Sequence, residues 1–445
     1  MIDIYFVSLG CDKNLVDSEK MLAILDHAGY RLAQEPEQAE VIVVNTCAFI
    51  HDAKQESIET LLEMAEYKKK GTCRVLIAAG CLAERYKDEI QKEMPEIDGI
   101  IGTTAYDTVA QVVEQTLAGR TAVSMKELSY IPPGLTDRIR SGAGHVGYLK
   151  IGEGCSKNCS YCAIPFMRGR YRSVPMEELI EEAVKLTAGG VKELILVAQE
   201  TTMYGVDLYG GKRLPELLER LAQIKAVQWI RILYCYPEEI TEELAEEIRK
   251  NKKVCHYLDL PIQHCNDEIL KKMGRRTDKR QLMEKIGMLR KRIPDIALRT
   301  TLISGFPGET EEQHEECIEF VKAMRFDRLG VFPYSPEEGT RAAGFEGQLE
   351  EEVKRRWADE IMETQQQVVF EANENMVGRR ITALVDGYLP EEGVYVARTC
   401  RDAPEIDGCV FFHSSAEILS GTMVELDVTD ASGYDLIGML CSEED

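Results

Sequence analysis

The stretch EGCSKNCSYCAIPFMRGRYRS, residues 153–173, places three cysteines within eight residues and then becomes basic. Cys155, Cys159 and Cys162 form the pattern C-x3-C-x2-C on a loop after an apolar run. Thiolates are soft ligands that suit iron–sulfur clusters and zinc. A structural zinc site needs four protein ligands, and the nearest histidine, His145, is expected at the opposite end of the apolar run. The spacing therefore favours a [4Fe–4S] cluster with one open iron over zinc or three incidental buried cysteines.

An iron without a protein ligand gives such a cluster a specific chemistry. It can chelate the amine and carboxylate of S-adenosylmethionine, and an electron from the cluster then breaks the sulfonium bond. The product is a 5′-deoxyadenosyl radical, which abstracts unactivated hydrogen atoms. The cysteine spacing, the aromatic Tyr161 before the third cysteine and the β/α pattern downstream resemble the radical S-adenosylmethionine superfamily. We refer to Cys155, Cys159 and Cys162 as the barrel triad.

Six strand–helix units follow within residues 145–376. Apolar strands alternate with amphipathic helices, which is the pattern of a parallel sheet covered by helices. The candidate strands are VGYLKIG (146–152), ELILVAQ (193–199), WIRILYCY (229–236), YLDLPI (257–262), IALRTTLI (296–303) and RLGVFPYS (328–335). Six units predict an α/β domain that forms an open (β/α)6 partial TIM barrel rather than a closed eightfold one. A long helix, from about Leu349 to Asn375, leads out of it.

Residues 1–118 show the same alternation and predict a doubly wound N-terminal domain. The candidate strands are IDIYFVSL (2–9), VIVVNTC (41–47), CRVLIAAGC (73–81) and IDGIIG (97–102). Cys11, Cys47 and Cys81 each stand at or just after the end of one of the first three strands. The carboxyl ends of parallel strands share one edge, where doubly wound domains hold ligands. We expect this N-terminal triad to hold a second cluster, and separate buried core thiols are the alternative.

The bulk composition limits the class of protein. Fourteen cysteines in a 445-residue chain with no basic, apolar leader favour metal or redox chemistry over a disulfide framework. No apolar run reaches the roughly 18 residues of a membrane span, so we expect a cytoplasmic protein without membrane contact. The cysteines outside the two triads show no ligand spacing and are expected to be structural: Cys73, Cys235, Cys255, Cys265, Cys317, Cys400, Cys409 and Cys441.

Two segments flank the predicted partial barrel. Residues 119–144 contain IPPGL and SGAG without sustained periodicity, so we expect a linker. Residues 377–445 change to short alternating strands with turn residues, which predicts a small, OB-like antiparallel β barrel. From residue 378 onward this segment has four arginines against fourteen acidic residues, a net charge of −10. The whole chain has a net charge of −24, which suits a basic partner or simply maintains solubility.

This three-part organisation resembles the methylthiotransferases over essentially the whole chain. The likeness is carried by SLGCDKNLVDSE (8–19), EGCSKNCSYCAIPFMRGRYRS (153–173), RTTLISGFPGET (299–310) and GVYVARTCRDAPEIDG (393–408). These motifs look most like the branch that modifies ribosomal protein S-twelve of the small subunit. The tRNA-modifying relatives are similar in architecture. The resemblance also implies that the terminal barrel is of the TRAM type.

The resemblance implies insertion of a methylthio group at the β-carbon of an aspartate in ribosomal protein S-twelve. It implies two [4Fe–4S] clusters, two molecules of S-adenosylmethionine per turnover, and sulfide or polysulfide as the sulfur source. One S-adenosylmethionine methylates a sulfur held at the N-terminal triad, and the second is cleaved at the barrel triad. An electron donor such as flavodoxin or ferredoxin is expected, and stable nucleic acid binding is not.

Residues at predicted strand ends are candidates to contact S-adenosylmethionine. The segment AQET resembles the family's segment near the amino group of that cofactor, which makes Gln199 and Glu200 candidates. Tyr161, Arg231 and Gln263 complete the set, because their segments are expected at the mouth of the barrel.

Two neighbouring segments are ambiguous. His264 is either a site residue or an ordinary buried polar residue. The basic segment RGRYRS (168–173) either contacts substrate or cofactor or is a solvated loop.

Two other functions compete with this interpretation. A tRNA adenosine methylthiotransferase would share every cysteine. A non-enzymatic iron–sulfur carrier or RNA-binding module would use the terminal barrel, but it leaves the β/α barrel and the open iron unexplained. An RNA-binding barrel normally offers a basic groove and stacking aromatics. The barrel here is acidic, and we expect its aromatic residues to fill its core: Tyr388, Tyr395, Phe411, Phe412 and Tyr434.

Overall fold

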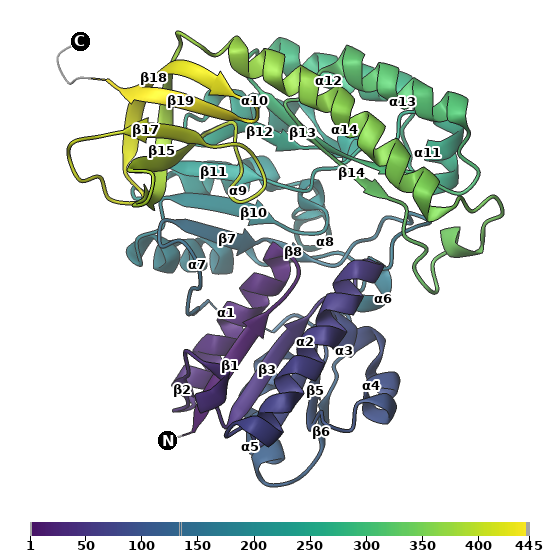
Figure 1. Ribbon diagram of the computed structural model, residues 1–445, viewed down its shortest axis with the longest axis vertical. Coiled ribbons are helices and arrows are strands. Elements are labelled where there is room, and N and C mark those ends of the chain that lie inside the picture. Colours follow the sequence, from purple (N-terminus) through teal and green to yellow (C-terminus); the bar gives the residue numbers. More distant parts are fainter. Residues whose placement is uncertain (1, 133, 135, 442–445) are drawn as a thin grey trace.

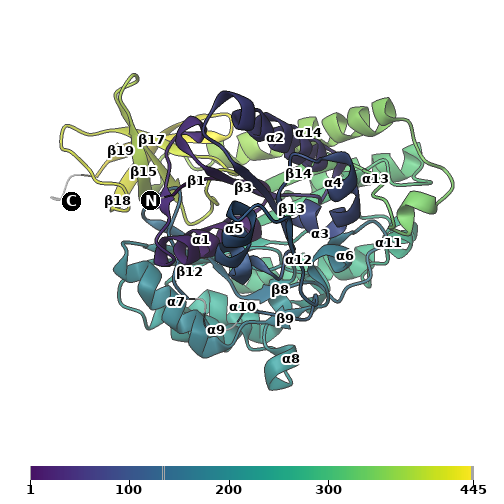
Figure 2. The ribbon, with the colours of Figure 1, turned by 90° about the horizontal axis from the view of Figure 1, so that it is seen from below.

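Three large sheets organise the protein, and each is formed by a different part of the sequence (Figure 1). The computed structural model describes residues 2–132, 134 and 136–441. The N-terminal sheet lies below the central sheet in Figure 1, and the C-terminal barrel lies beside the central sheet. Figure 2 shows the N-terminal domain from below, in front of the central sheet. The predicted α/β architecture with a terminal β barrel is confirmed.

The N-terminal sheet is parallel, with the strand order β2-β1-β3-β4-β5-β6. Its strands are β1 (Asp3–Ser8), β2 (Arg31–Leu32), β3 (Val41–Thr46), β4 (Val75–Gly80), β5 (Gly99–Ile101) and β6 (Ala122–Ser124). Its helices are α1 (Asp12–His27), α2 (His51–Lys70), α3 (Cys81–Arg85), α4 (Lys87–Glu93) and α5 (Val109–Leu117). Apolar residues of α1 and α5 cover one face of the sheet, and those of α2, α3 and α4 cover the other.

The sequence predicted four of these six strands. The two short strands β2 and β6 were missed, and β6 lies within the segment expected to be a linker. Residues 133 and 135 lie outside the described part. Besides β6, the other described residues of 119–144 form no helix or strand. Arg138 of this segment is buried and pairs with Glu19 of α1 and Glu182 of α7. The segment is therefore bound between two domains by ion pairs.

The central sheet is also parallel and remains open, with the order β14-β13-β12-β11-β10-β7. Its strands are β7 (Val146–Lys150), β10 (Glu193–Val197), β11 (Trp229–Ile232), β12 (Val254–Asp259), β13 (Ala297–Ser304) and β14 (Arg328–Pro333). The helices of this domain are α6 (Ile164–Arg168), α7 (Met176–Ala188), α8 (Val206–Tyr209), α9 (Leu214–Ala222), α10 (Glu242–Lys250), α11 (Asp267–Met273), α12 (Lys279–Arg292) and α13 (Glu311–Met324). A two-stranded ribbon, β8 (Gly152–Glu153) with β9 (Arg172–Ser173), brackets the barrel triad.

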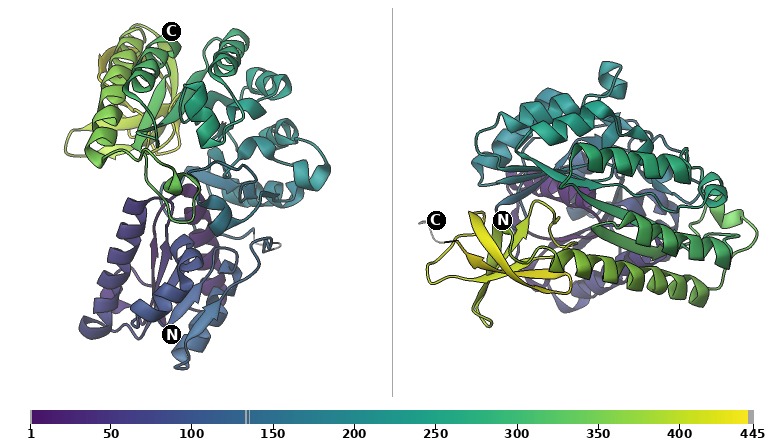
Figure 3. Two further views of the ribbon diagram at one scale, coloured as in Figure 1. Left: turned by 90° about the vertical axis from the view of Figure 1, so that its right-hand side faces the viewer. Right: turned by 90° about the horizontal axis from the view of Figure 1, so that it is seen from above.

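The C-terminal barrel is closed, with the order β15-β16-β17-β19-β18 (Figure 3). Its strands are β15 (Arg380–Leu389), β16 (Val394–Thr399), β17 (Val410–His413), β18 (Met423–Ser432) and β19 (Asp435–Leu440). The long helix α14 (Glu351–Glu374) packs on β14 and leads into it. Tyr395 and Phe412 are in the barrel core as predicted, whereas Tyr388 and Tyr434 are exposed, contrary to the prediction.

The barrel packs onto the inner face of the central sheet. Leu384 and Ala403 of the barrel share an apolar cluster with Ile195, Trp229 and Tyr257 of the sheet. The opposite face of the sheet forms the largest core, with the helices α7, α9, α10, α12 and α13. Within the described residues, no helix has the length and apolar character needed to cross a membrane.

Candidate functional site

The N-terminal triad lies at the carboxyl edge of the N-terminal sheet. Cys11 directly precedes α1, Cys47 follows β3, and Cys81 begins α3 immediately after β4. The loops approach closely: a Cβ added at Gly10, whose φ is +88°, would lie 2.8 Å from the Cβ of Cys47. Burial, together with the neighbouring Cys81 and Cys11 thiols, raises the pKa of the Cys47 thiol to about 12. The strand ends thus bring together three thiols separated widely in sequence.

Asn14 links the three cysteine loops. Its side-chain amide donates to the carbonyl oxygens of Leu9 and Thr46, at 3.0 and 2.9 Å, just before Cys11 and Cys47. Its Oδ1 lies 3.8 Å from the Sγ of Cys81 and accepts a hydrogen bond from Arg168. A fully buried asparagine with these partners fixes the relative positions of the loops.

Arg168 connects this edge to the barrel domain. It belongs to α6, six residues after Cys162, and its buried guanidinium pairs with Asp17 of α1 and Glu153 of β8. Lys150 pairs with the same two carboxylates. The basic segment is therefore not a solvated loop at this position, because Arg168 is 3% exposed.

The barrel triad lies on the loop between β8 and α6. Gly154 precedes Cys155 with a φ of +76°, and a Cβ there would lie 2.4–2.7 Å from three carbonyl oxygens of residues 168–170. The Sγ of Cys159 lies 3.4 Å from the hydroxyl of Tyr236. Burial raises the pKa of Cys155 to about 11 and that of Cys162 above its ordinary value. Cys155 is buried, Cys159 and Cys162 are half-buried, and an aromatic ring lies beside Cys159.

The segment 234–236, after β11, contacts both cysteine regions. Tyr236 contacts Cys159, while the hydroxyl of Tyr234 donates to Asp12, next to Cys11, at 3.0 Å. The ammonium of Lys13 lies 3.4 Å from the centre of the Tyr234 ring. Burial lowers the pKa of Lys13, but Tyr234, Cys11 and Asp12 outweigh this and raise it above its ordinary value. Both cysteine regions therefore border the same short segment.

Gln199 and Glu200 follow β10 and have polar atoms available for a ligand. Both the Oε1 of Gln199 and the Oε2 of Glu200 are buried, with no hydrogen-bond partner among the described residues. The Nε2 of Gln199 donates to Glu153, and Lys157 lies 3.9 Å from Glu200. Burial is the main cause that raises the pKa of Glu200 to about 7. Two orphaned acceptors near the barrel triad fit the amino group of S-adenosylmethionine.

Two other residues expected to contact S-adenosylmethionine, Tyr161 and Gln263, lie in different surroundings. Tyr161 packs against the aromatic cluster of Phe306 and Tyr334, beside the cysteines that flank it in sequence. Gln263 adopts a φ of +72°, and its backbone bonds to Thr301 and Ile303 of β13. Left-handed backbone at a non-glycine residue is typical of functional sites, so Gln263 stays a candidate.

Arg231 does not lie at the barrel mouth as expected. Its side chain is fully buried on the inner face of the central sheet, where it pairs with Glu193 at 2.8 Å. It also donates to the carbonyl oxygens of Thr399 and Cys400 in the C-terminal barrel. Arg231 therefore joins two domains, and each of its three guanidinium nitrogens already has a partner in the protein.

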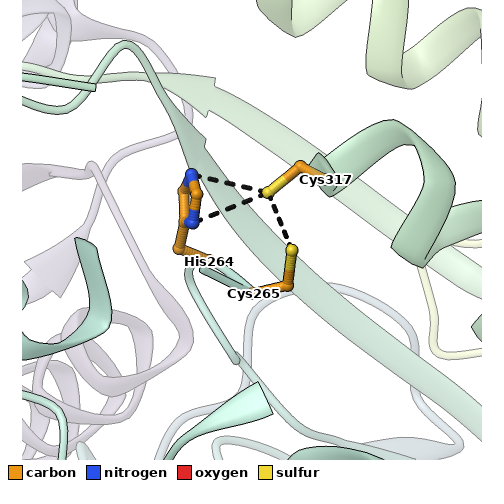
Figure 4. A group of neighbouring side chains, drawn as sticks. All are labelled: His264, Cys265 and Cys317. Atoms are coloured by element: carbon orange, nitrogen blue, oxygen red, sulfur yellow. Dashed lines mark hydrogen bonds between the residues drawn. The ribbon is translucent and has the colours of Figure 1, made fainter. Parts of the chain in front are cut away.

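His264 belongs to a separate buried cluster with Cys265 and Cys317 (Figure 4). The two sulfurs lie 3.3 Å apart, and the Sγ of Cys317 lies 3.6 and 3.4 Å from the two ring nitrogens. A sulfur almost equidistant from both nitrogens lies on the lone-pair axis of neither. The backbone N–H of Asn266 and the carboxylate of Glu309 already bond the ring nitrogens. We interpret the cluster as structural packing.

Sequence reasoning missed Asn14, Lys13, Tyr234 and Tyr236. Asn14 stands one helical turn after Cys11, and the two tyrosines end a predicted strand, so their positions could have been noticed. Their contacts across the domains depend on tertiary structure.

Comparisons with known proteins agree with this arrangement. Three family models match: "Uncharacterized protein family UPF0004" at residues 3–102, "Radical SAM superfamily" at 149–321 and "TRAM domain" at 377–441. A ribosomal protein uS12 methylthiotransferase RimO from Lachnoclostridium phytofermentans is 56% identical, covering 98% of this chain and 99% of that protein. The protein of the same name from Clostridioides difficile is 47% identical, covering 98% of each.

This chain belongs to the uS12 methylthiotransferase family. It is a radical S-adenosylmethionine transferase, and the family uses two [4Fe–4S] clusters with S-adenosylmethionine. Among solved structures, the radical S-adenosylmethionine methyltransferase TsrM from Kitasatospora setae has a similar fold. Its TM-score is 0.54 at 14% identity, with 91% of this chain and 82% of that chain covered.

Proposed function

We propose that the chain transfers a methylthio group to the β-carbon of an aspartate in ribosomal protein uS12. The observation that carries the proposal is that one short segment, 234–236, contacts both cysteine regions. A reaction that both removes hydrogen and delivers sulfur needs two centres that reach one substrate carbon. The uS12 methylthiotransferases at 46–56% identity support the same reaction and the same substrate.

The barrel triad would hold the cluster that binds S-adenosylmethionine, and the N-terminal triad would hold the second cluster. When bound, these groups supply radical generation and the sulfur and methyl groups. Glu200 and Gln199 accept hydrogen bonds from the amino group of S-adenosylmethionine, and Tyr161 and Gln263 border the same space. Tyr236 shields Cys159 from water, and Asn14 holds the N-terminal loops in register. Positioning and exclusion of water are the usual contributions of a protein to such chemistry.

A protein substrate suits the C-terminal barrel better than tRNA does. Three of its four arginines are paired with carboxylates: Arg380 with Asp427, Arg398 with Asp386 and Glu193, and Arg401 with Asp327. Exposed acidic residues occur around the barrel, at Glu391, Glu392, Glu405, Glu417, Glu425 and Asp430. Acidic charge attracts a lysine- and arginine-rich ribosomal protein and repels a phosphate backbone. The exposed Tyr388 and Tyr434 offer stacking surface, so tRNA adenosine remains the alternative substrate.

The same proposal covers the electron donor, the sulfur source and the location of the enzyme. Flavodoxin or ferredoxin supplies the electron, and sulfide or polysulfide supplies the sulfur. The enzyme uses two molecules of S-adenosylmethionine per turnover and forms no stable complex with nucleic acid. Because its substrate is a ribosomal protein, we place the enzyme in the cytoplasm.

The test uses reconstituted enzyme with uS12 and, separately, with tRNA. Mass spectrometry should find a methylthio group on one aspartate of uS12 and none on tRNA. Methylthiolated adenosine with unmodified uS12 would assign the chain to the tRNA branch instead.

Charge reversal tests the docking of uS12. Changing Glu391 and Glu392, in the turn between β15 and β16, to lysine should weaken uS12 binding, and added salt should weaken wild-type binding. The matched control reverses Asp88 and Glu89 on α4, which are also adjacent and exposed. Deletion of 378–445 is a poorer test, because it would uncover the apolar face that includes Trp229 and Tyr257.

A further inference from the structure

Lys13 is a buried cation at the junction of the two domains. It lies in the first turn of α1, two residues after Cys11, and its side chain reaches Tyr234 beyond the end of β11. Two residues further along the same segment, Tyr236 contacts Cys159 of the barrel triad. Lys13 therefore stands beside Cys11 and contacts the segment that also reaches the barrel triad.

This ammonium has no carboxylate partner in a salt bridge within the part of the chain that the structure describes. The adjacent Asp12 carboxylate instead accepts the hydroxyl of Tyr234. Burial opposes the charge, but Tyr234, Cys11 and Asp12 keep the ammonium protonated, and the Tyr234 ring adds a cation–π contact. The site therefore presents a charged ammonium without a salt-bridge partner to an incoming anion.

Most other cations near the triads have a carboxylate partner. Lys150 and Arg168 share Asp17 and Glu153. Lys157 pairs with Glu239. Arg275 lies 3.7 Å from Glu238 and donates to the carbonyl of Pro261. Arg172 donates through Nη1 to the carbonyls of Arg168 and Arg170, whereas its Nε and Nη2 are buried without a hydrogen-bond partner among the described residues. Lys13 differs from Arg172 because it stands two residues from Cys11 and contacts the segment that also reaches Cys159.

Tyr234 holds Lys13 in place. Its φ of +59° is unusual for a residue with a side chain, and such strain persists only where the surroundings fix it. Its backbone N–H donates to Asp259 at 3.0 Å, and its hydroxyl donates to Asp12 at 3.0 Å. The ring under the Lys13 ammonium is thus fixed at both ends, which is the preorganisation that a binding residue needs.

We propose that Lys13 binds the side-chain carboxylate of the aspartate that the enzyme modifies. This inference rests on the proposed function, and it names the group that recognises an acidic substrate residue. A carboxylate paired with Lys13 places the adjacent β-carbon between the two triads and leaves its hydrogens free. Lys13 also gives the site a reason to reject a neutral residue, because binding such a residue would leave the ammonium unpaired.

The test measures equilibrium binding of uS12 to the enzyme with both clusters and S-adenosylmethionine but without reductant, so that no turnover occurs. The probes are uS12 and uS12 with the target aspartate changed to asparagine. Wild-type enzyme should prefer the aspartate form by about 10- to 100-fold, the usual range for a charge-assisted hydrogen bond. Lys13→Met should remove the preference by weakening the aspartate form alone. Lys13→Arg should keep most of it, because the cation is retained.

The control is Lys92→Met, which removes an exposed lysine of α4 and should leave the preference unchanged. An undiminished preference in Lys13→Met would overturn the proposal, as would its complete loss in Lys13→Arg. Iron content and electron paramagnetic resonance spectra are recorded without uS12. A changed cluster signal in Lys13→Met would assign the cation to the cluster instead. If wild-type enzyme binds neither form of uS12, the proposed function fails; if it binds both equally, only the role of Lys13 fails.

Discussion

The barrel triad comes from a single loop, whereas the N-terminal triad is assembled from three strand–helix connections spread over the N-terminal sheet. The single loop is shaped locally, by Gly154 and by its contacts with the carbonyls of residues 168–170. The N-terminal triad depends on the register of the whole sheet and on Asn14, which bonds to its loops. The barrel site should therefore tolerate disturbance of the N-terminal domain, while the N-terminal site should respond to it.

Removal of the barrel triad should have the largest effect. Changing Cys155, Cys159 and Cys162 to alanine should abolish 5′-deoxyadenosine formation and leave about four of about eight irons per chain. The reason is that radical generation requires the cluster at this loop. Iron analysis after anaerobic reconstitution, with chromatography of the nucleoside product, provides the measurement. A full iron complement in this variant would contradict the assignment.

Removal of the N-terminal triad should separate the two halves of the reaction. With Cys11, Cys47 and Cys81 changed to alanine, 5′-deoxyadenosine should still form, because the barrel loop is shaped locally. The methylthio product should disappear with the second cluster. Both products can be followed in one reaction by mass spectrometry. Persistence of the methylthio product would mean that sulfur is delivered elsewhere.

Asn14→Ala should damage only the cluster site at the N-terminal triad. Loss of its buried hydrogen bonds should lower the free energy of unfolding by about 2–4 kcal/mol and deplete iron at the N-terminal triad. The control is Asn373→Ala on α14, where a buried asparagine donates to the carbonyl of Gly433 far from the clusters in sequence. Both variants should be less stable, but iron content should fall in Asn14→Ala alone. Equal iron loss would show that general destabilisation is responsible.

The smallest effect concerns the pH dependence of cofactor binding. Burial raises the pKa of Glu200 to about 7, so its carboxylate becomes ionised only as the pH rises through that value. The ionised form is the better acceptor for an amino group, so affinity for S-adenosylmethionine should increase from pH 6 to pH 8. Glu200→Gln should bind about tenfold more weakly at pH 8 and should lose this pH dependence. Titration calorimetry measures the affinity for S-adenosylmethionine and its pH dependence. The control is Glu247→Gln, which changes another buried glutamate, on α10.

The architecture was predictable because long apolar strands and amphipathic helices alternate regularly. The strands β2 and β6 contain two and three residues, which is too short for periodicity to reveal. The convergence of the N-terminal triad also followed from the sequence, since parallel strands place their carboxyl ends at one edge.

The position of the Arg231 side chain could not be predicted from the sequence in the same way. Side chains alternate between the two faces of a strand, and the sequence does not reveal that the C-terminal barrel covers the inner face. Lys13 and Tyr234 lie more than 200 positions apart, and no local pattern pairs them. Such cross-domain contacts come from tertiary packing alone.

The buried ion pairs between the central sheet and the C-terminal barrel limit how this enzyme can diversify. Glu193 binds both Arg231 of its own domain and Arg398 of the barrel. A chimera with a barrel from another enzyme would leave these charges mismatched unless the arginine were transplanted too. Evolution of a new target is therefore expected to proceed by changes in exposed turns such as 390–393, while the inner contacts stay constant. We therefore expect the barrel to be inherited together with the catalytic core.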